Sequence, residues 1–201
     1  MRLFVIGATG RTGQEILSLA IPRGHTVTAY VRSPQKIASD GKRIAVWKGS
    51  PTDEERLAEA MQNHDAVFSV LGPVDTSMAG TLLQKSALAT TRAMKRAKVE
   101  RLAILSAAAL FPGFLNGIAR RILRVHMEDC LAMEKIVESS GLEWTIARPP
   151  RLTGGGSTTY RSREGAPPKM GFVLSRRAVA SFMLDVVEQK SHLQKIVGIA
   201  K

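Results

Sequence analysis

LFVIGATGRTG, residues 3–13, joins an apolar run to three glycines at three-residue spacing. A buried β-strand, a tight turn and the first turn of a helix fit this order of residues. One glycine is needed where the turn requires a free φ, one where the backbone approaches a ligand, and one where the helix packs on the strand. The free amides at the beginning of such a helix, together with its macrodipole, form a site for a pyrophosphate. A purely structural turn is the alternative interpretation.

Short β-rich runs alternate with helical segments along the chain. Strands are predicted at 2–6, 26–31, 44–48, 66–71, 102–105, 144–147 and 195–199, and helices at 14–20, 53–62, 81–98, 127–140 and after Ser175. Such alternation specifies parallel strands joined by crossover helices. We therefore predict the α/β class, with a doubly wound parallel sheet of the Rossmann type in a single domain, 1–201.

Two stretches, 107–126 and 152–171, interrupt this alternation. Both follow the ends of predicted strands, where open α/β sheets bind their ligands. We predict that they form the walls of a substrate pocket.

Composition is that of an ordinary globular protein, with 44% hydrophobic and 23% charged residues. The single cysteine, Cys130, excludes an intrachain disulfide, and the four histidines lack metal-ligand spacing, so no metal is expected. No apolar stretch approaches the roughly 20 residues of a membrane span. We expect a cytoplasmic monomer or homodimer without a membrane partner.

The net charge of +12 is unevenly distributed, because residues 148–177 hold seven basic residues and one acid. Such a field attracts a phosphorylated cofactor, an anionic substrate, nucleic acid or an anionic membrane, and it also fits solvated arginines with no partner. Nucleic acid is the weakest of these interpretations.

Arg32 stands at the end of the second predicted strand, with Lys36 shortly after it. An acidic residue at this place would hold the ribose hydroxyls of NAD, and it would repel a 2′-phosphate. A guanidinium instead grips a phosphate with two charge-assisted hydrogen bonds. We therefore predict NADPH rather than NADH, with a solvated arginine as the alternative.

Six motifs together resemble one known family. They are GATGRTG (7–13), VTAYVRSPQK (27–36), DAVFSVLG (65–72), AMKRAKVERLAILSA (93–107), MEKIVESSGLEWTIARPPRLTG (133–154) and LSRRAVASFML (174–184). The chain resembles the atypical short-chain dehydrogenase/reductases with an NAD(P)H-binding domain, the NmrA-like group, and within it the biliverdin IXβ reductase and flavin reductase branch. The resemblance implies a Rossmann fold and the reduction of a planar acceptor.

The resemblance also assigns cofactor contacts. It places the pyrophosphate at Gly7, Thr9, Gly10, Arg11, Thr12 and Gly13, and the 2′-phosphate at Arg32 and Lys36. Ser50 and Pro51 stand near the adenine, where many relatives have an aspartate. Leu71, Gly72 and Leu83 would contact the adenosine and ribose, and Leu105, Ser106, Pro149, Pro150 and Arg151 would lie near the nicotinamide.

Ser106 and Lys135 are the candidate catalytic residues. Larger short-chain reductases use a Tyr-x-x-x-Lys pair for proton transfer, and the matching stretch 131–135 keeps the lysine without the tyrosine. This loss argues against alcohol/ketone interconversion, which needs a positioned acid. A flavin (FMN or FAD), a quinone or a biliverdin-like tetrapyrrole delocalises the incoming charge, so that water can supply the proton. A non-catalytic NADP(H)-binding sensor of the NmrA-like type is the alternative.

The stretch 109–127 mixes apolar and basic residues. We predict that it covers a planar acceptor, with guanidinium groups for propionates or a flavin phosphate. The candidate pocket residues are Phe111, Phe114, Arg120, Arg124, His126 and Arg151. Core packing and a surface membrane helix are the alternatives.

Overall fold

An eight-stranded sheet forms the centre of the chain, in a computed structural model that describes residues 1–37, 42–72, 81–113 and 124–201. Its strand order is β3-β2-β1-β4-β5-β6-β10-β8. The bounds are β1 (Arg2–Ile6), β2 (Thr26–Val31), β3 (Ile44–Lys48), β4 (Ala66–Ser69), β5 (Arg101–Leu105), β6 (Glu143–Arg148), β8 (Arg161–Glu164) and β10 (Lys195–Ala200). All neighbours pair in parallel except β8, which runs antiparallel to β10 at the edge. The predicted doubly wound Rossmann sheet is confirmed.

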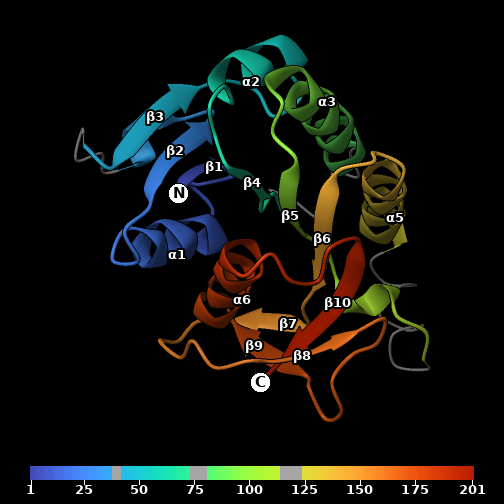
Figure 1. Cartoon of the computed structure of the whole chain (residues 1–201). Coiled ribbons are helices and arrows are strands. Elements are labelled where there is room, and N and C mark those ends of the chain that lie inside the picture. The colour runs from blue at the N-terminus through green and yellow to red at the C-terminus, as the bar shows by residue number, and fades with distance from the viewer. Residues whose placement is uncertain (38–41, 73–80, 114–123) are drawn as a thin grey trace.

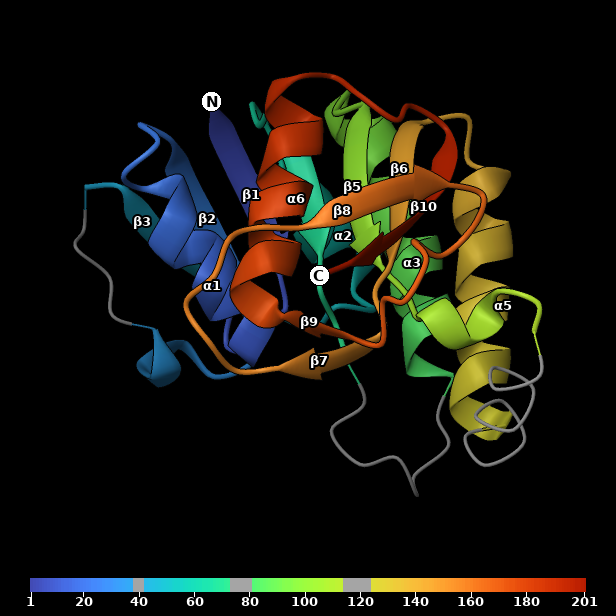
Figure 2. The same ribbon diagram turned by 90° about the horizontal axis from the view of Figure 1, so that it is seen from below.

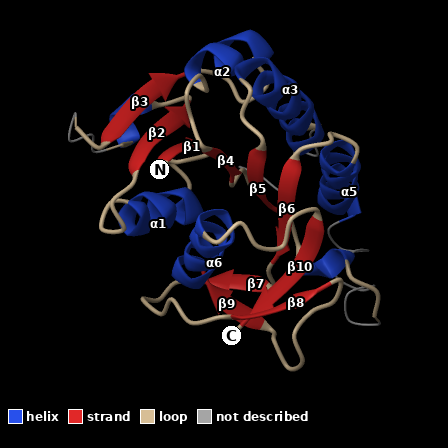
Figure 3. Cartoon of the chain, viewed as in Figure 1, coloured by secondary structure: helices blue, strands red, loops and turns tan. Residues whose placement is uncertain are grey.

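Helices cover both faces of this sheet (Figures 1 and 3). One face carries α1 (Arg11–Ala20) and α6 (Arg176–Glu188), which pack against each other, and the other carries α2 (Glu54–Ala60), α3 (Leu82–Ala97) and α5 (Arg124–Glu138). Two short 3₁₀ turns, η1 (Pro34–Lys36) and η2 (Ala108–Leu110), follow β2 and β5. Within the described ranges, no helix has the length and apolar character needed to cross a bilayer.

The strands are apolar on both sides because both faces of the sheet are buried. In β1, Leu3 and Val5 join the core beneath α1 and α6, whereas Phe4 and Ile6 join the core beneath α2, α3 and α5. This explains why the first strand appears in the sequence as a continuous apolar run and not as an alternating one.

Residues 152–171, which we predicted as a pocket wall, contain strands that the sequence pattern did not reveal. They contain β8, and Leu152 and Thr153 belong to β7 (Arg151–Thr153), which pairs in parallel with β9 (Val173–Ser175) in a small second sheet near the start of α6 (Figure 2). All four residues of β8 are exposed. An exposed, charged edge strand has no hydrophobic alternation, so pattern alone does not reveal it.

The described residues of 107–126, which we predicted as a pocket wall, belong in part to regular elements. They include η2, and α5 begins at Arg124, three residues before its predicted start. The intervening residues 114–123 lie outside the described part of the chain, so the predicted pocket residues Phe114 and Arg120 have no described position.

Candidate functional site

The carboxyl ends of the parallel strands meet at one edge of the sheet. Ile6 pairs with Tyr30 of β2 and with Ser69 of β4, and Leu105 pairs with Ala147 of β6. The segments after these strands therefore converge. They hold the glycine turn after β1, Arg32 after β2, Ser50 and Pro51 after β3, Leu71 and Gly72 after β4, Ser106 after β5, and Pro149, Pro150 and Arg151 after β6.

The glycine turn joins β1 to α1 without a side-chain cap. Gly7 has φ +87°, and a Cβ on Gly13 would lie 2.7 Å from the Cα of Ala8. These contacts account for two glycines by backbone conformation and packing alone. Gly10 is the N-cap of α1 and offers no capping side chain. By contrast, the Asp53 and Ser175 side chains cap α2 and α6 by accepting from backbone N–H groups at 3.0 Å. The first amides of α1 therefore remain open to an anion.

Several basic side chains at this edge have no partner among the described residues. Within the described ranges, none of the following cations forms an ion pair or a side-chain hydrogen bond: Arg11, Arg32, Lys36, Arg151 and Arg176. All are exposed except Arg176, which is partly buried. Cations gathered on one edge without compensating carboxylates give that edge a positive potential.

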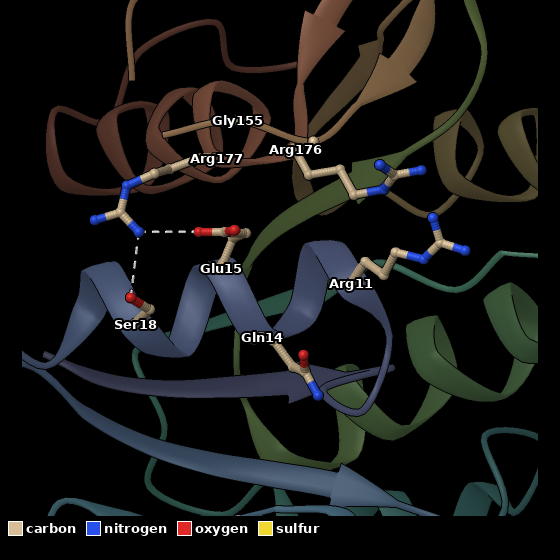
Figure 4. A pocket seen from close by; sticks show the side chains of 8 residues that line it. Arg11, Gln14, Glu15, Ser18, Gly155, Arg176 and Arg177 are labelled. Carbon is tan, nitrogen blue, oxygen red and sulfur yellow. Dashed lines mark hydrogen bonds and ion pairs between the residues drawn. The ribbon is translucent and has the colours of Figure 1, made fainter. Parts of the chain in front are cut away.

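A cleft of about 480 Å³ lies beside the turn, between α1 and α6. It is lined by Arg11, Gln14, Glu15, Ser18, Gly154, Gly155, Arg176 and Arg177 (Figure 4). The Glu15 carboxylate already has an ion-pair partner. Arg177 donates to it at 3.0 Å and to the Ser18 hydroxyl at 3.3 Å. The cleft thus brings part of the predicted substrate segment, at Gly154 and Gly155, next to the glycine turn.

The end of β3 is closely packed. The Tyr30 hydroxyl donates to the Ser50 carbonyl oxygen at 3.2 Å, and burial raises the pKa of Tyr30 to about 12. A Cβ on Gly49 would overlap the Tyr30 ring, so the glycine is needed there for space. The Ser50 hydroxyl lies 2.9 Å from that of Thr52, and Pro51 is buried.

Ser106 lies at the joint between β5 and β6. Its backbone N–H donates to the Ala147 carbonyl oxygen at 2.8 Å, whereas its buried Oγ forms no hydrogen bond of regular geometry in the described structure and interacts only with the Cys130 thiol. The Cys130 side chain of α5 is close by, and burial raises the pKa of its thiol to about 12. An unsatisfied buried hydroxyl at a ligand-binding edge is a candidate ligand contact.

Lys135 lies on a different face of α5 from Cys130. The buried face of α5 presents Cys130 and Glu134 to the sheet, and Lys135 lies on the exposed face of the same helix. In the stretch 131–135, matched by resemblance to Tyr-x-x-x-Lys, Lys135 is therefore exposed and Glu134 is buried. The sequence pattern did not reveal the buried ion pair between Glu134 and Arg148. In this pair the Arg148 Nε donates to the Glu134 Oε1 at 2.9 Å.

Leu83 also belongs to the core. Its side chain is buried beneath α5, and its backbone N–H donates to the Asp129 carboxylate at 2.9 Å. Asp129 thereby caps the beginning of α3 and joins it to α5. The Leu83 side chain, which we predicted to contact the adenosine and ribose, is therefore buried in this structure.

The predicted acceptor wall is only partly assembled by the described residues. Phe111 is 2% exposed and packs under the Arg148 guanidinium, 4.7 Å from the ring centroid, so its ring is buried. Arg124 is exposed and pairs with Glu128 at 3.6 Å. His126 is half-buried, with Nε2 3.7 Å from the Cys130 Sγ, and burial lowers its pKa.

Known proteins match this arrangement at the level of family and fold. The family model for NAD(P)H-binding proteins matches residues 7–190. The oxidoreductase stcQ of Emericella nidulans is 33% identical over 132 residues, covering 57% of this chain and 48% of stcQ. The oxidoreductase aflX of Aspergillus parasiticus is 30% identical over 137 residues, covering 62% of this chain and 52% of aflX. This chain thus spans about half the length of these curated relatives.

The solved structures agree in fold. A short-chain dehydrogenase/reductase from Veillonella parvula, solved in complex with NADP, superposes with a TM-score of 0.86 at 20% identity, over 100% of this chain and 94% of that one. A Rossmann-fold NAD(P)-binding protein from Shigella flexneri gives a TM-score of 0.80 at 24% identity, over 100% and 93% of the two chains. At this identity the likeness shows the Rossmann fold alone.

Proposed function

The chain belongs to the family of NAD(P)H-binding proteins, and we propose that it is an NADPH-dependent reductase that passes hydride to a planar, conjugated acceptor. Flavins, quinones and biliverdin-like tetrapyrroles are the acceptor class. The observation that carries this proposal is the set of unpartnered cations around an uncapped glycine turn, at the edge where strands of this fold bind dinucleotides.

The residues at this edge fit a phosphorylated dinucleotide. The open amides at the start of α1 suit a pyrophosphate, because they lack both helical acceptors and a capping side chain. Arg32 and Lys36, exposed after β2, suit the 2′-phosphate that distinguishes NADPH from NADH. The buried Ser106 hydroxyl at the end of β5, which lacks a hydrogen bond of regular geometry, suits a polar group at the nicotinamide end.

NADPH, when bound, supplies a hydride from its nicotinamide. This chain has two tyrosines, and both are engaged elsewhere. Tyr30 donates to the Ser50 carbonyl oxygen, and Tyr160 donates to the Asp185 carboxylate at 2.7 Å. Neither can serve as the acid that protonates an alkoxide. A conjugated acceptor spreads the charge of the hydride over its ring system and takes its proton from water, so the protein has only to hold and orient it.

The proposal is tested by following NADPH oxidation by the purified protein with FMN, a quinone, biliverdin and a simple ketone. We expect turnover with at least one conjugated acceptor and none with the ketone. Tight NADPH binding without turnover of any conjugated acceptor would contradict the reductase and favour a sensor that binds NADP(H) and acts on a partner. Turnover of the ketone alone would contradict the acceptor class.

A further inference from the structure

We propose that Arg176 joins Arg11 in a site for one phosphoryl or carboxylate group, at the end of the cleft between α1 and α6 nearest the glycine turn. Neither the motifs of the sequence nor the resemblance assigns a role to Arg176. The inference rests on the proposed function for the identity of the ligand, and it adds a residue of α6 to a site so far formed by the glycine turn and α1.

The two arginines come from helices that pack side by side. Arg11 is the first residue of α1, and Arg176 is the first residue of α6. Figure 4 shows their side chains extending in the same direction, with the guanidinium groups facing each other. Arg177 extends the opposite way, to Glu15 and Ser18. Arg176 and Arg177 are adjacent on α6, but their side chains therefore lie toward opposite ends of the cleft.

Two guanidinium groups that face each other repel, and an anion between them relieves this repulsion. In the described ranges, no carboxylate pairs with either of them, and Glu15, the acid that lines the cleft, is already held by Arg177. Arg176 is partly buried, so its position is set by packing more than that of a free surface side chain. This arrangement is typical of an anion site whose ligand comes from outside the chain.

The ligand is a group with two or more oxygens on one centre. A guanidinium pairs with a phosphate or carboxylate through two parallel N–H···O bonds, and two guanidiniums can share one phosphoryl group. The cleft has a volume of about 480 Å³, so it has room for a larger molecule that carries the anion. That molecule is either the cofactor, through its pyrophosphate, or the acceptor, through a phosphate or carboxylate substituent.

The experiment compares Arg176→Met with Arg177→Met in the full chain. Both variants remove one positive charge from neighbouring positions, but only Arg177 has an acidic partner. Nucleotide fluorescence measures the Kd values of NADPH and NADH. Steady-state turnover measures the KM values of FMN and of riboflavin, which lacks the phosphate. Circular dichroism and thermal melting establish that both variants fold.

We expect Arg176→Met to weaken a phosphoryl-bearing ligand by about tenfold or more, and Arg177→Met to weaken it by about twofold or less. Equal weakening of NADPH and NADH identifies the cofactor pyrophosphate as the anion. A higher KM for FMN with an unchanged KM for riboflavin identifies the acceptor. If Arg11 and Arg176 share one anion, the double variant Arg11→Met/Arg176→Met loses less than the product of the two single effects.

The inference is overturned if Arg176→Met leaves all four constants unchanged, or if Arg177→Met has as large an effect, since a diffuse field would then explain the result. The proposed function fails separately. A wild-type protein that binds NADPH and reduces nothing contradicts the reductase, while the NADPH and NADH constants still decide the role of Arg176.

Discussion

Single residues at the carboxyl edge differ in what fixes them. Gly7 and Gly13 are required by the turn itself, through a positive φ and through close packing, whether or not a ligand binds. Arg32 has no structural partner in the described residues, and neither does Arg176. Charged side chains that pair with no other group of the protein are the ones whose replacement should affect binding more than stability.

Replacing Arg32 by Ala should raise the Kd of NADPH by about 10- to 100-fold, because a charge-assisted contact with the 2′-phosphate is lost. The Kd of NADH should change little, since NADH lacks that phosphate. Titration calorimetry with both nucleotides measures the two constants on one preparation. Equal losses for the two nucleotides would show that Arg32 reads something other than the 2′-phosphate.

At the scale of elements, the phase of α5 decides which of its residues reach the site. The resemblance aligns residues 131–135 with the Tyr-x-x-x-Lys motif. In the α-helix, however, Lys135 is exposed to solvent and Glu134 packs against β6. The side chains of Glu134 and Arg148 are 3% and 10% exposed, so their pair is buried. Replacement of one partner leaves the other charged and unpaired.

We therefore expect Glu134→Gln to lower the free energy of unfolding by about 3 kcal/mol. Lys135→Gln should change it by less than about 0.5 kcal/mol, as is usual for exposed positions, and should leave kcat unchanged. Urea denaturation and steady-state turnover provide the two measurements. A loss of turnover in Lys135→Gln without a loss of stability would return Lys135 to the catalytic site.

The elements differ in how far the sequence determines them. Buried parallel strands such as β1 and β2 are predictable because every residue between their ends is apolar or β-branched. The edge strand β8 is not, because its exposed side chains carry no periodicity. In the site, Arg32 is predictable because it directly follows a strand. Arg176 is not, because its position depends on the packing of α6 against α1, which no local pattern encodes.

At the scale of the whole molecule, the sheet topology brings the glycine turn and the unpaired cations to one edge. The order β3-β2-β1-β4-β5-β6 reverses direction next to β1, and the crevice beside such a switch point binds ligands in doubly wound sheets. Part of the net charge of +12 lies at this edge as cations that pair with no described acid. Fold and charge thus favour the same place for a phosphorylated cofactor.

The central claim is that this edge holds NADPH so that its hydride passes directly to a conjugated acceptor. It is tested most directly with NADPH that carries deuterium on one or the other side of the nicotinamide C4, oxidised by the protein in the presence of FMN. Mass spectrometry of the NADP⁺ product then shows which label is lost. We predict that deuterium leaves from one side only, because a bound nicotinamide presents one face to the acceptor. Loss from both sides would contradict the claim, and so would the absence of NADP⁺ above the rate without protein when a quinone and biliverdin have also been tried in place of FMN.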